Sequence, residues 1–260
     1  MATMKRGWRM VGAIAVVLTL VLGLVSCGAS SVGEVATDVD DATTAEATPA
    51  AATPPEGFAA DLPRLNGEAT VVLTVKEAPI TIALNGEAAP ITAGNFVDLV
   101  QRKVYDGTVF HRVVRQPTPF VVQGGDPQST DPSVPPQALG TGSYRDPQTG
   151  KVRLIPLEIL PEGADVPVYS ATFEQARIAE SPALAHTRGA VAMARSPAPD
   201  SASAQFYIAL ADLTPLDGAY AVFGYVTEGM DVVDTIEMGD RIESAVVTEG
   251  AENFQAPTAE

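Results

Sequence analysis

The sequence predicts a mainly β fold: a closed antiparallel β-barrel capped by two helices, with an enlarged loop region. Short runs rich in β-branched and aromatic residues recur between residues 69 and 247, separated by glycine and proline turn signals. Two segments, 92–100 and 230–236, place apolar residues at helical spacing and predict the two capping helices. The stretch from Ser129 to Ala185 is longer than a simple link between strands, and loops of this length are usually functional or disordered.

The N-terminus has the layout of a secretory signal. Three basic residues precede an uncharged stretch, 11–25, and the tetrapeptide LVSC ends at Cys27, the only cysteine of the chain. LVSC resembles a bacterial lipobox, so residues 1–27 are expected to be a lipoprotein signal peptide with Cys27 as the lipidation site. The alternative is an uncleaved membrane anchor, because the uncharged stretch continues to Gly33. Either interpretation predicts an extracytoplasmic domain, and the first predicts lipid anchoring to a membrane of the bacterial cell envelope.

Composition divides the rest of the chain. Residues 28–60 are mostly Ala, Thr, Ser, Pro and acidic residues and cannot bury a core, so a disordered linker is expected there. The folded domain is expected over 61–250, followed by a flexible tail over 251–260. The formal net charge is −16, and the residues beyond Cys27 hold 13 basic against 32 acidic groups. This excess of negative charge disfavours binding to nucleic acid.

The first elements of the domain are a predicted β-hairpin and a helix. Two runs between residues 69 and 84 alternate like half-buried strands, with a tight turn expected at Glu77 and Ala78. Thr92 is expected to be the N-cap of the next helix, whose apolar face includes Phe96.

Later segments continue the pattern. A loop with two prolines, RQPTP, separates one pair of short strands, and a loop of Pro, Ser, Ala and Asp separates a second pair. In the enlarged loop region, Ser170 or Thr172 is expected to cap a short helix through Phe173 and Ile178. The expected strands are 109–114, 120–126, 190–194, 205–208 and 242–250, and the second helix covers 230–236.

Two polar side chains interrupt the apolar residues of the first strand pair. Arg112 and Gln123 lie among phenylalanines and valines, where they would supply a rigid donor fork and a neutral amide. Taken singly, they are better explained as a surface arginine and a strand end. The second pair also places a glutamine, Gln205, beside aromatic residues, and a third block adds Leu216 and Tyr220. The repetition indicates one shared site.

Other kinds of site have weaker support. His111 and His186 are not at metal-ligand spacing with other candidates, so no metal site is expected and both are interpreted as structural. The chain has no nucleophile elbow, Walker loop or dinucleotide fingerprint, and no cofactor is expected. Asp126 is expected to be solvated surface charge.

Five motifs occur in order along the chain: YDGTVFHRV, FVVQGGD, HTRGAVAMAR, SAQFYI and LDGAYAVFGYV. In this order they resemble the cyclophilin family of peptidyl-prolyl cis/trans isomerases. The resemblance covers residues 69–247 and implies the family's barrel with a site on its outer face. The tract Asp146–Ile159 resembles a variant found in envelope or thylakoid-lumen cyclophilins.

The resemblance implies a role for each candidate residue. Arg112 matches the family's catalytic arginine, Phe120 the aromatic floor of its proline pocket, and Gln123 the glutamine beside them. The implied substrate-binding residues are Val121, Ala194, Arg195, Gln205, Tyr207, Leu216 and Tyr220.

Several positions depart from the usual family residue. Val121 stands where methionine is usual, and Arg195 where asparagine is common. Tyr207 replaces phenylalanine, and its hydroxyl needs a hydrogen-bond partner or a wet pocket edge. Tyr220 stands where many members have histidine. Pro215 occupies the position of the tryptophan in cyclosporin-sensitive members, so weak binding of cyclosporin is expected.

The implied reaction requires neither metal nor cofactor. Amide resonance opposes rotation about a peptide bond with a barrier of about 18 to 20 kcal/mol. The imide nitrogen gains a lone pair only when the bond is twisted, so a donor aimed at it, here Arg112, binds the transition state better than the planar ground state. The expected partners are proline-containing segments of unfolded or flexible proteins, and the domain is expected to be monomeric. A non-catalytic proline-peptide-binding chaperone is the alternative, and a purely structural envelope lipoprotein is a third hypothesis.

Overall fold

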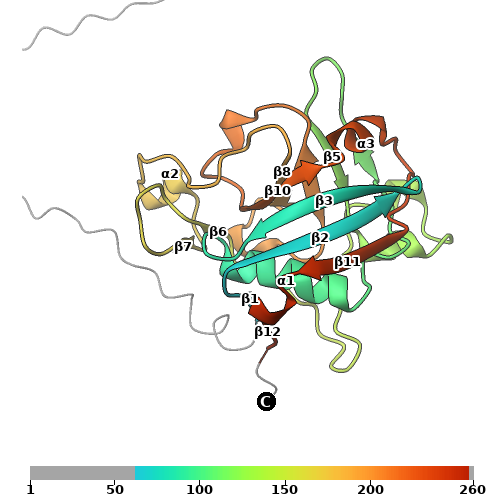
Figure 1. Cartoon of the computed structure of the whole chain (residues 1–260), viewed down its shortest axis with the longest axis horizontal. Coiled ribbons are helices and arrows are strands. Elements are labelled where there is room, and N and C mark those ends of the chain that lie inside the picture. The colour runs from blue at the N-terminus through green and yellow to red at the C-terminus, as the bar shows by residue number, and fades with distance from the viewer. Residues whose placement is uncertain (1–61, 258–260) are drawn as a thin grey trace, which may run out of the picture. The chain divides into compact units, whose positions relative to one another are not determined.

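The computed structural model describes residues 62–257, which form a curled β-sheet with one long helix packed beside it (Figure 1). The predicted signal peptide with Cys27 and the predicted linker, 28–60, lie outside the described residues, as do residues 258–260. In the described part of the chain, no helix is both long enough and apolar enough to cross a membrane.

Eight strands form one antiparallel sheet in the order β11-β2-β3-β10-β8-β9-β5-β4, and β1 with β12 and β6 with β7 form two small pairs. The mainly β, antiparallel prediction is confirmed. The strands are β1 Arg64–Leu65, β2 Glu68–Val75, β3 Ala78–Asn85, β4 Arg112–Val113, β5 Val121–Gly124, β6 Glu158–Ile159, β7 Val168–Tyr169, β8 Ala190–Met193, β9 Phe206–Ala209, β10 Val222–Glu228, β11 Ser244–Glu249 and β12 Phe254–Gln255. The helices are α1 Pro90–Gln101, α2 Phe173–Ala176 and α3 Met230–Thr235.

The two ends of the large sheet are joined by the segments that precede β4 and β11. The Phe110 N–H donates to the Asp240 carbonyl (2.8 Å), and the Ile242 N–H donates to the Thr108 carbonyl (2.9 Å). These bonds close the curled sheet around its core, because they pair the backbone of the two segments that lead into its terminal strands.

Four buried aromatic rings fill the interior. The Phe96 ring centroid lies 5.0 Å from that of Tyr105, 5.3 Å from Phe206 and 5.1 Å from Phe223. All four side chains are fully buried. Since Phe96 belongs to α1, Phe206 to β9 and Phe223 to β10, this cluster fixes the helix against strands next to the candidate site.

The β2–β3 hairpin turns one residue earlier than predicted. Lys76 and Glu77 form the turn with φ of 52° and 61°, whereas Ala78 is already the first residue of β3. Two successive positive φ values are typical of the two-residue turns whose twist matches paired strands.

The predicted N-cap of α1 is wrong. The helix begins at Pro90, so Thr92 lies inside its first turn. The Glu158 carboxylate of β6 accepts hydrogen bonds from the Ile91 N–H (3.2 Å), the Thr92 N–H (2.8 Å) and the Thr92 hydroxyl (2.9 Å). A distant acidic side chain therefore satisfies N–H groups that a local cap normally satisfies.

The enlarged loop region is ordered and packs on the barrel. Thr172 caps α2 as predicted and forms a reciprocal capping box with Gln175, although the helix ends at Ala176, before Ile178. Behind it lies a small buried cluster of Leu157, Ile159, Phe173 and Ala221.

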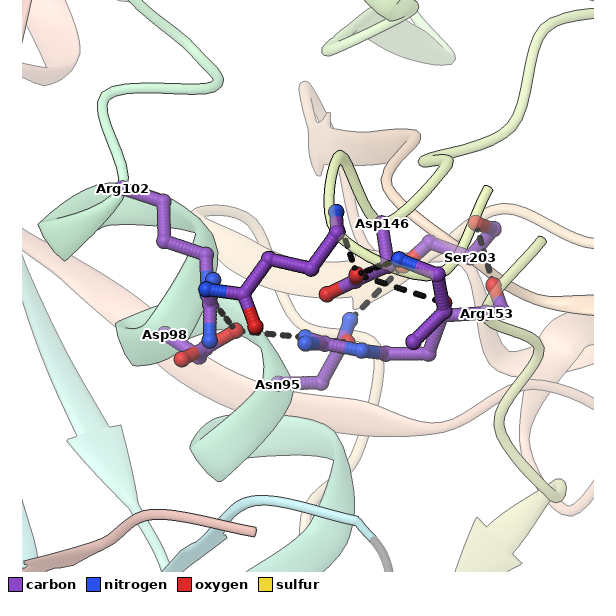
Figure 2. A network of polar contacts seen from close by, with 8 residues as sticks. Asn95, Asp98, Arg102, Asp146, Arg153 and Ser203 are labelled. Carbon is purple, nitrogen blue, oxygen red and sulfur yellow. Dashed lines mark hydrogen bonds and ion pairs between the residues drawn. The ribbon is translucent and has the colours of Figure 1, made fainter. Parts of the chain in front are cut away.

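A polar network fastens another part of this region to α1 (Figure 2). The Asp98 carboxylate accepts hydrogen bonds from Arg102 (2.7 Å) and Arg153 (2.6 Å). The Arg153 carbonyl accepts from the Ser203 hydroxyl (2.6 Å), and the Asn95 amide donates to the Ser203 carbonyl (2.7 Å). The network thereby joins α1, the enlarged loop region and the segment that leads into β9.

The predicted flexible tail is corrected in part. Residues 254–255 form β12, which pairs with β1 in the register Arg64↔Gln255 and Leu65↔Phe254. The chain therefore continues in the folded domain past residue 250. The sequence does not predict this strand, because two residues are too few to produce an alternating pattern.

Candidate active site

Nine of the ten predicted site residues line one groove of about 280 Å³. Strands β4, β5 and β9 supply one side of it, and the loop between β9 and β10 supplies the other. The lining residues are Arg112, Phe120, Val121, Gln123, Ala194, Arg195, Tyr207, Leu216 and Tyr220. The tenth, Gln205, lies directly behind Gln123.

A series of hydrogen bonds through two glutamine side chains holds Arg112 at the mouth of the groove. Strand pairing places Arg112 opposite Gln123, and the Arg112 Nη1 donates to Gln123 Oε1 (3.3 Å). The Gln123 Nε2 donates to Gln205 Oε1 (3.2 Å), and the Gln205 Nε2 donates to the Gly142 carbonyl (2.8 Å). The guanidinium lies 5.5 Å from the Phe120 ring centroid. Because a guanidinium carries five N–H donors, most remain available to a substrate.

The floor of the groove is apolar except for one satisfied hydroxyl. Val121 and Tyr207 belong to a buried hydrophobic cluster, and Phe120 packs against it. The Tyr207 hydroxyl lies 2.9 Å from His186 Nε2, and His186 Nδ1 lies 2.8 Å from an Asp217 carboxylate oxygen. The required partner of the tyrosine is therefore His186, a residue that the sequence assigned only a structural role.

Burial sets the protonation of this Tyr–His pair. It raises the pKa of the Tyr207 hydroxyl and lowers the pKa of His186, while Asp217 opposes the second shift. A neutral His186 donates from Nδ1 to Asp217 and accepts from Tyr207 at Nε2. The hydroxyl is thus directed away from the groove, which stays apolar.

The loop side of the groove is held by Arg195. Its Nε and Nη2 donate to the Ala219 carbonyl (3.1 and 2.6 Å), and its guanidinium lies 4.6 Å from the Tyr220 ring centroid. Leu216 and Tyr220 are half-buried on this loop, facing the groove.

A second pocket of about 490 Å³ adjoins the first and was not foreseen. It shares Gln123, Ala194 and Arg195 with the first groove. Its other lining residues are Gly140, Thr141, Gly142, Ser143, Leu154, Ser196, Ser201, Ser203 and Gln205. Small and hydroxyl residues in a long loop carry no sequence signal of a site.

Asp126 shapes this second pocket, and its predicted solvation is wrong. The Asp126 side chain is fully buried, and its carboxylate accepts from the backbone N–H groups of Gln128 (2.9 Å), Gly140 (2.6 Å) and Gly142 (3.1 Å). Backbone N–H groups of a folded loop therefore replace water around it. This contact brings the Gly142 carbonyl to Gln205.

Comparison with known proteins agrees with this geometry. The sequence profile of the family described as cyclophilin type peptidyl-prolyl cis-trans isomerase/CLD matches residues 70–253. The chain belongs to the cyclophilin family. The match includes residues of every strand of the large sheet and all residues that line the two pockets, so the matched region contains the candidate active site.

Several cyclophilin relatives are similar over most of the domain. A putative thylakoid lumen peptidyl-prolyl cis-trans isomerase of Synechocystis sp. is 44% identical over 211 residues, which are 77% of this chain and 52% of the relative. A chloroplastic isomerase of Arabidopsis thaliana is 38% identical and shares 76% of this chain and 46% of its own. The chain thus spans about half the length of these relatives. A peptidyl-prolyl cis-trans isomerase of Acinetobacter baylyi is 35% identical over 60% of this chain and 65% of its own.

A solved cyclophilin of Cryptosporidium parvum matches the fold with a TM-score of 0.52 at 22% identity, covering 70% of this chain and 98% of that one.

Within residues 62–257, no three or more His, Cys, Asp or Glu side chains are grouped so as to hold a metal ion. The ten predicted site residues thus lie together in a cyclophilin barrel, and Cys27 lies outside the described part.

Proposed function

We propose that this domain is a peptidyl-prolyl cis/trans isomerase that accelerates X-Pro isomerisation during the folding of secreted or envelope proteins. One observation carries the proposal: the Arg112 guanidinium is oriented by Gln123 at the mouth of an apolar groove. The names of the relatives support the same activity.

The groove favours the twisted imide over the planar one. The prolyl ring would occupy the apolar floor formed by Phe120, Val121 and Tyr207, and the flanking backbone would lie along the edge at Ala194 and Arg195. Arg112 would then donate to the imide nitrogen, which becomes a good acceptor only when the bond is twisted. The Arg112–Gln123 bond orients this donor before the substrate arrives, and each 1.4 kcal/mol of preference for the twisted state gives about a tenfold rate increase.

The site of action is proposed to be extracytoplasmic, with the chain lipid-anchored through Cys27 to a membrane of the bacterial cell envelope and acting as a monomer. The basic and apolar N-terminal pattern supports an extracytoplasmic location, as does the name of the Synechocystis relative, a putative thylakoid lumen isomerase. Metabolic labelling with a fatty acid tests the anchor: label should enter the parent and be absent from Cys27→Ser.

A chaperone that binds proline segments without turnover is the second candidate. Val121 and Tyr207 in the lining of the groove, and Pro215 next to Leu216, depart from the usual family residues. They leave room for this candidate, because they change the site without removing it. The two functions share a binding mode and differ in rate acceleration.

Isomerisation of a short X-Pro peptide, measured by NMR exchange, separates the two candidates. Residues 28–260 and the Arg112→Ala form should bind the peptide, and the variant should lose about a hundredfold or more in catalysis. Arg112→Lys should recover only part of the loss, because an ammonium lacks the planar fork. Lys151→Gln, an exposed charge outside both pockets, is the matched control and should match the parent. Peptide binding by the parent without faster exchange would support the chaperone.

A further inference from the structure

The residues that line the groove and the adjoining pocket have a formal charge opposite to that of the whole chain, and the buried Asp126 carboxylate behind them is held by backbone N–H groups. The whole chain has a formal net charge of −16, yet neither the first groove nor the adjoining pocket has an Asp or Glu in its lining. Two arginines contribute charge there: Arg112 to the first groove, and Arg195 to both. A cleft lined by charge of one sign attracts ligands of the other sign.

Arg195 lines both pockets, and no nearby carboxylate of the described residues neutralises its charge. No carboxylate within residues 62–257 lies within ion-pair distance of its guanidinium. Its hydrogen bonds go to backbone carbonyls instead: Nε and Nη2 to Ala219, and Nη1 to Ser196 (2.9 Å) and Pro197 (3.3 Å). These four bonds occupy four of the five N–H donors, which leaves one donor on Nη2.

The guanidinium is also pre-positioned. Its backbone contacts and its stacking on Tyr220 fix its plane, so little rotamer entropy remains to be lost when a ligand binds. Arg195 is half-buried, and screening by salt is weaker for such a group than for a fully exposed one.

We propose that Arg195 makes this site select proline segments that carry an acidic side chain a few residues from the proline, where the peptide crosses from the first groove into the adjoining pocket. This inference rests on the proposed use of the groove for proline peptides. Arg195 is then a specificity-determining residue, and the substrate class is acidic proline-containing segments. Arg112 adds to the positive potential, but its role in this proposal is to donate a hydrogen bond to the imide nitrogen.

The test compares kcat/KM for paired peptides on the same enzyme. A set of X-Pro peptides carries a single Glu at each of the three positions before and after the proline, and each peptide has a twin with Gln at the same place. For residues 28–260 we expect one position at which the Glu peptide exceeds its twin roughly fivefold in kcat/KM. This Glu/Gln ratio should fall towards one in Arg195→Gln and decline with rising ionic strength.

The ratio separates a selective role from a merely structural one. If Arg195 only holds the Ala219 loop, Arg195→Gln lowers kcat/KM for both twins equally and leaves the ratio unchanged, which would overturn the proposal. Equal values for Glu and Gln at every position in the parent would also overturn it. Lys151→Gln removes the same charge outside both pockets and should preserve the ratio.

The test does not depend on turnover. If the domain binds but does not isomerise the peptides, the proposed enzyme function fails, and the ratio of the two dissociation constants replaces the ratio of kcat/KM. A Glu preference in Kd that Arg195→Gln abolishes supports the selective role of Arg195, and its absence rejects that role.

Discussion

The two sides of the groove are built differently. The strand wall, formed by Arg112, Phe120, Val121, Gln123 and Tyr207, belongs to or adjoins strands with continuous registers: β4 pairs with β5, β5 with β9, and β9 with β8. The loop wall, formed by Leu216 and Tyr220, lies between β9 and β10 and has no strand partner. Repeated backbone bonds position the first wall, whereas single contacts position the second.

Contacts from three different segments hold the loop wall. The His186 N–H donates to the Asp217 carboxylate (2.8 Å), the Phe173 N–H donates to the Gly218 carbonyl (2.8 Å), and Arg195 bonds to Ala219. Phe173 belongs to the enlarged loop region, so that region supports the site as well as covering the barrel. We therefore expect changes in the core behind the strand wall to affect mainly stability, and changes to the loop wall to affect mainly activity.

The largest effect should follow removal of the ring behind the strand wall. Phe206 is fully buried on β9 against Phe96, Tyr105 and Phe110. Phe206→Ala should lower the free energy of unfolding by about 3 to 5 kcal/mol, because it leaves a cavity among closely packed rings. Urea denaturation measures this. Phe120→Ala, at the half-buried groove surface, should cost much less stability while weakening peptide binding. Equal losses in the free energy of unfolding in the two variants would contradict this prediction.

The next effect should come from the link between the enlarged loop region and α1. Glu158→Gln replaces one of two acceptor oxygens with an amide N–H₂ that faces donors from Ile91 or Thr92. We expect a loss of about 1 to 3 kcal/mol in the free energy of unfolding, the usual result of unpaired buried polar groups.

Glu162→Gln, an exposed glutamate in the same region, is the control and should change stability very little. If Glu158→Gln were equally harmless, the enlarged loop region would not be fastened to the helix through this carboxylate.

A third change should move the loop wall while sparing the barrel. Gly218 has φ +70°, and a Cβ added there would lie 2.8 to 2.9 Å from the buried Phe173 side chain. Gly218→Ala should reduce kcat/KM for an X-Pro peptide roughly tenfold, because it displaces Leu216 and Tyr220 from the groove.

Gly150→Ala is the control, because it introduces the same backbone strain without a contact to another side chain. Gly150 has φ +69°, and an added Cβ would meet nothing within 4 Å. Gly150→Ala should share the cost of a positive φ, about 1 to 2 kcal/mol, and keep full activity. Equal activity in the two variants would show that the Phe173 contact does not set the loop wall.

The smallest effect concerns pH. Burial lowers the pKa of His186 below its ordinary value near 6.5, so the folded protein binds this proton less readily than the unfolded chain. The stability associated with neutral His186 is present above pH 6.5 and is lost as pH falls towards the folded-state pKa. His186→Gln removes this term, while His111, whose pKa burial also lowers, contributes alike to both proteins.

Urea midpoints at pH 7.5, 6.5 and 5.5 test the sign. The stability difference between the parent and His186→Gln should shrink as the pH falls. A difference independent of pH would mean that His186 has the same pKa in the folded and the unfolded protein, and it would contradict the prediction.

The sequence alone determined the features that depend on neighbouring residues. Alternating apolar side chains predicted the β2–β3 hairpin, a capping residue at Ser170 or Thr172 predicted the start of α2, and apolar spacing predicted α3. The family motifs predicted the nine residues that line the groove and Gln205 behind them, because each motif includes a strand together with the site residues on it or next to it. Local pattern is sufficient wherever an element and its signal occupy the same stretch of chain.

Only the tertiary structure decided the features that join distant segments. Glu158 caps a helix 67 residues away, Gln205 bonds to Gly142 across 63 residues, and Asp126 is buried by N–H groups of a loop. No local pattern marks these partners, since a carboxylate or an amide has the same sequence context whether it faces water or a backbone donor. Folding chooses between the two, because a buried polar group needs a partner and the nearest one is set by packing.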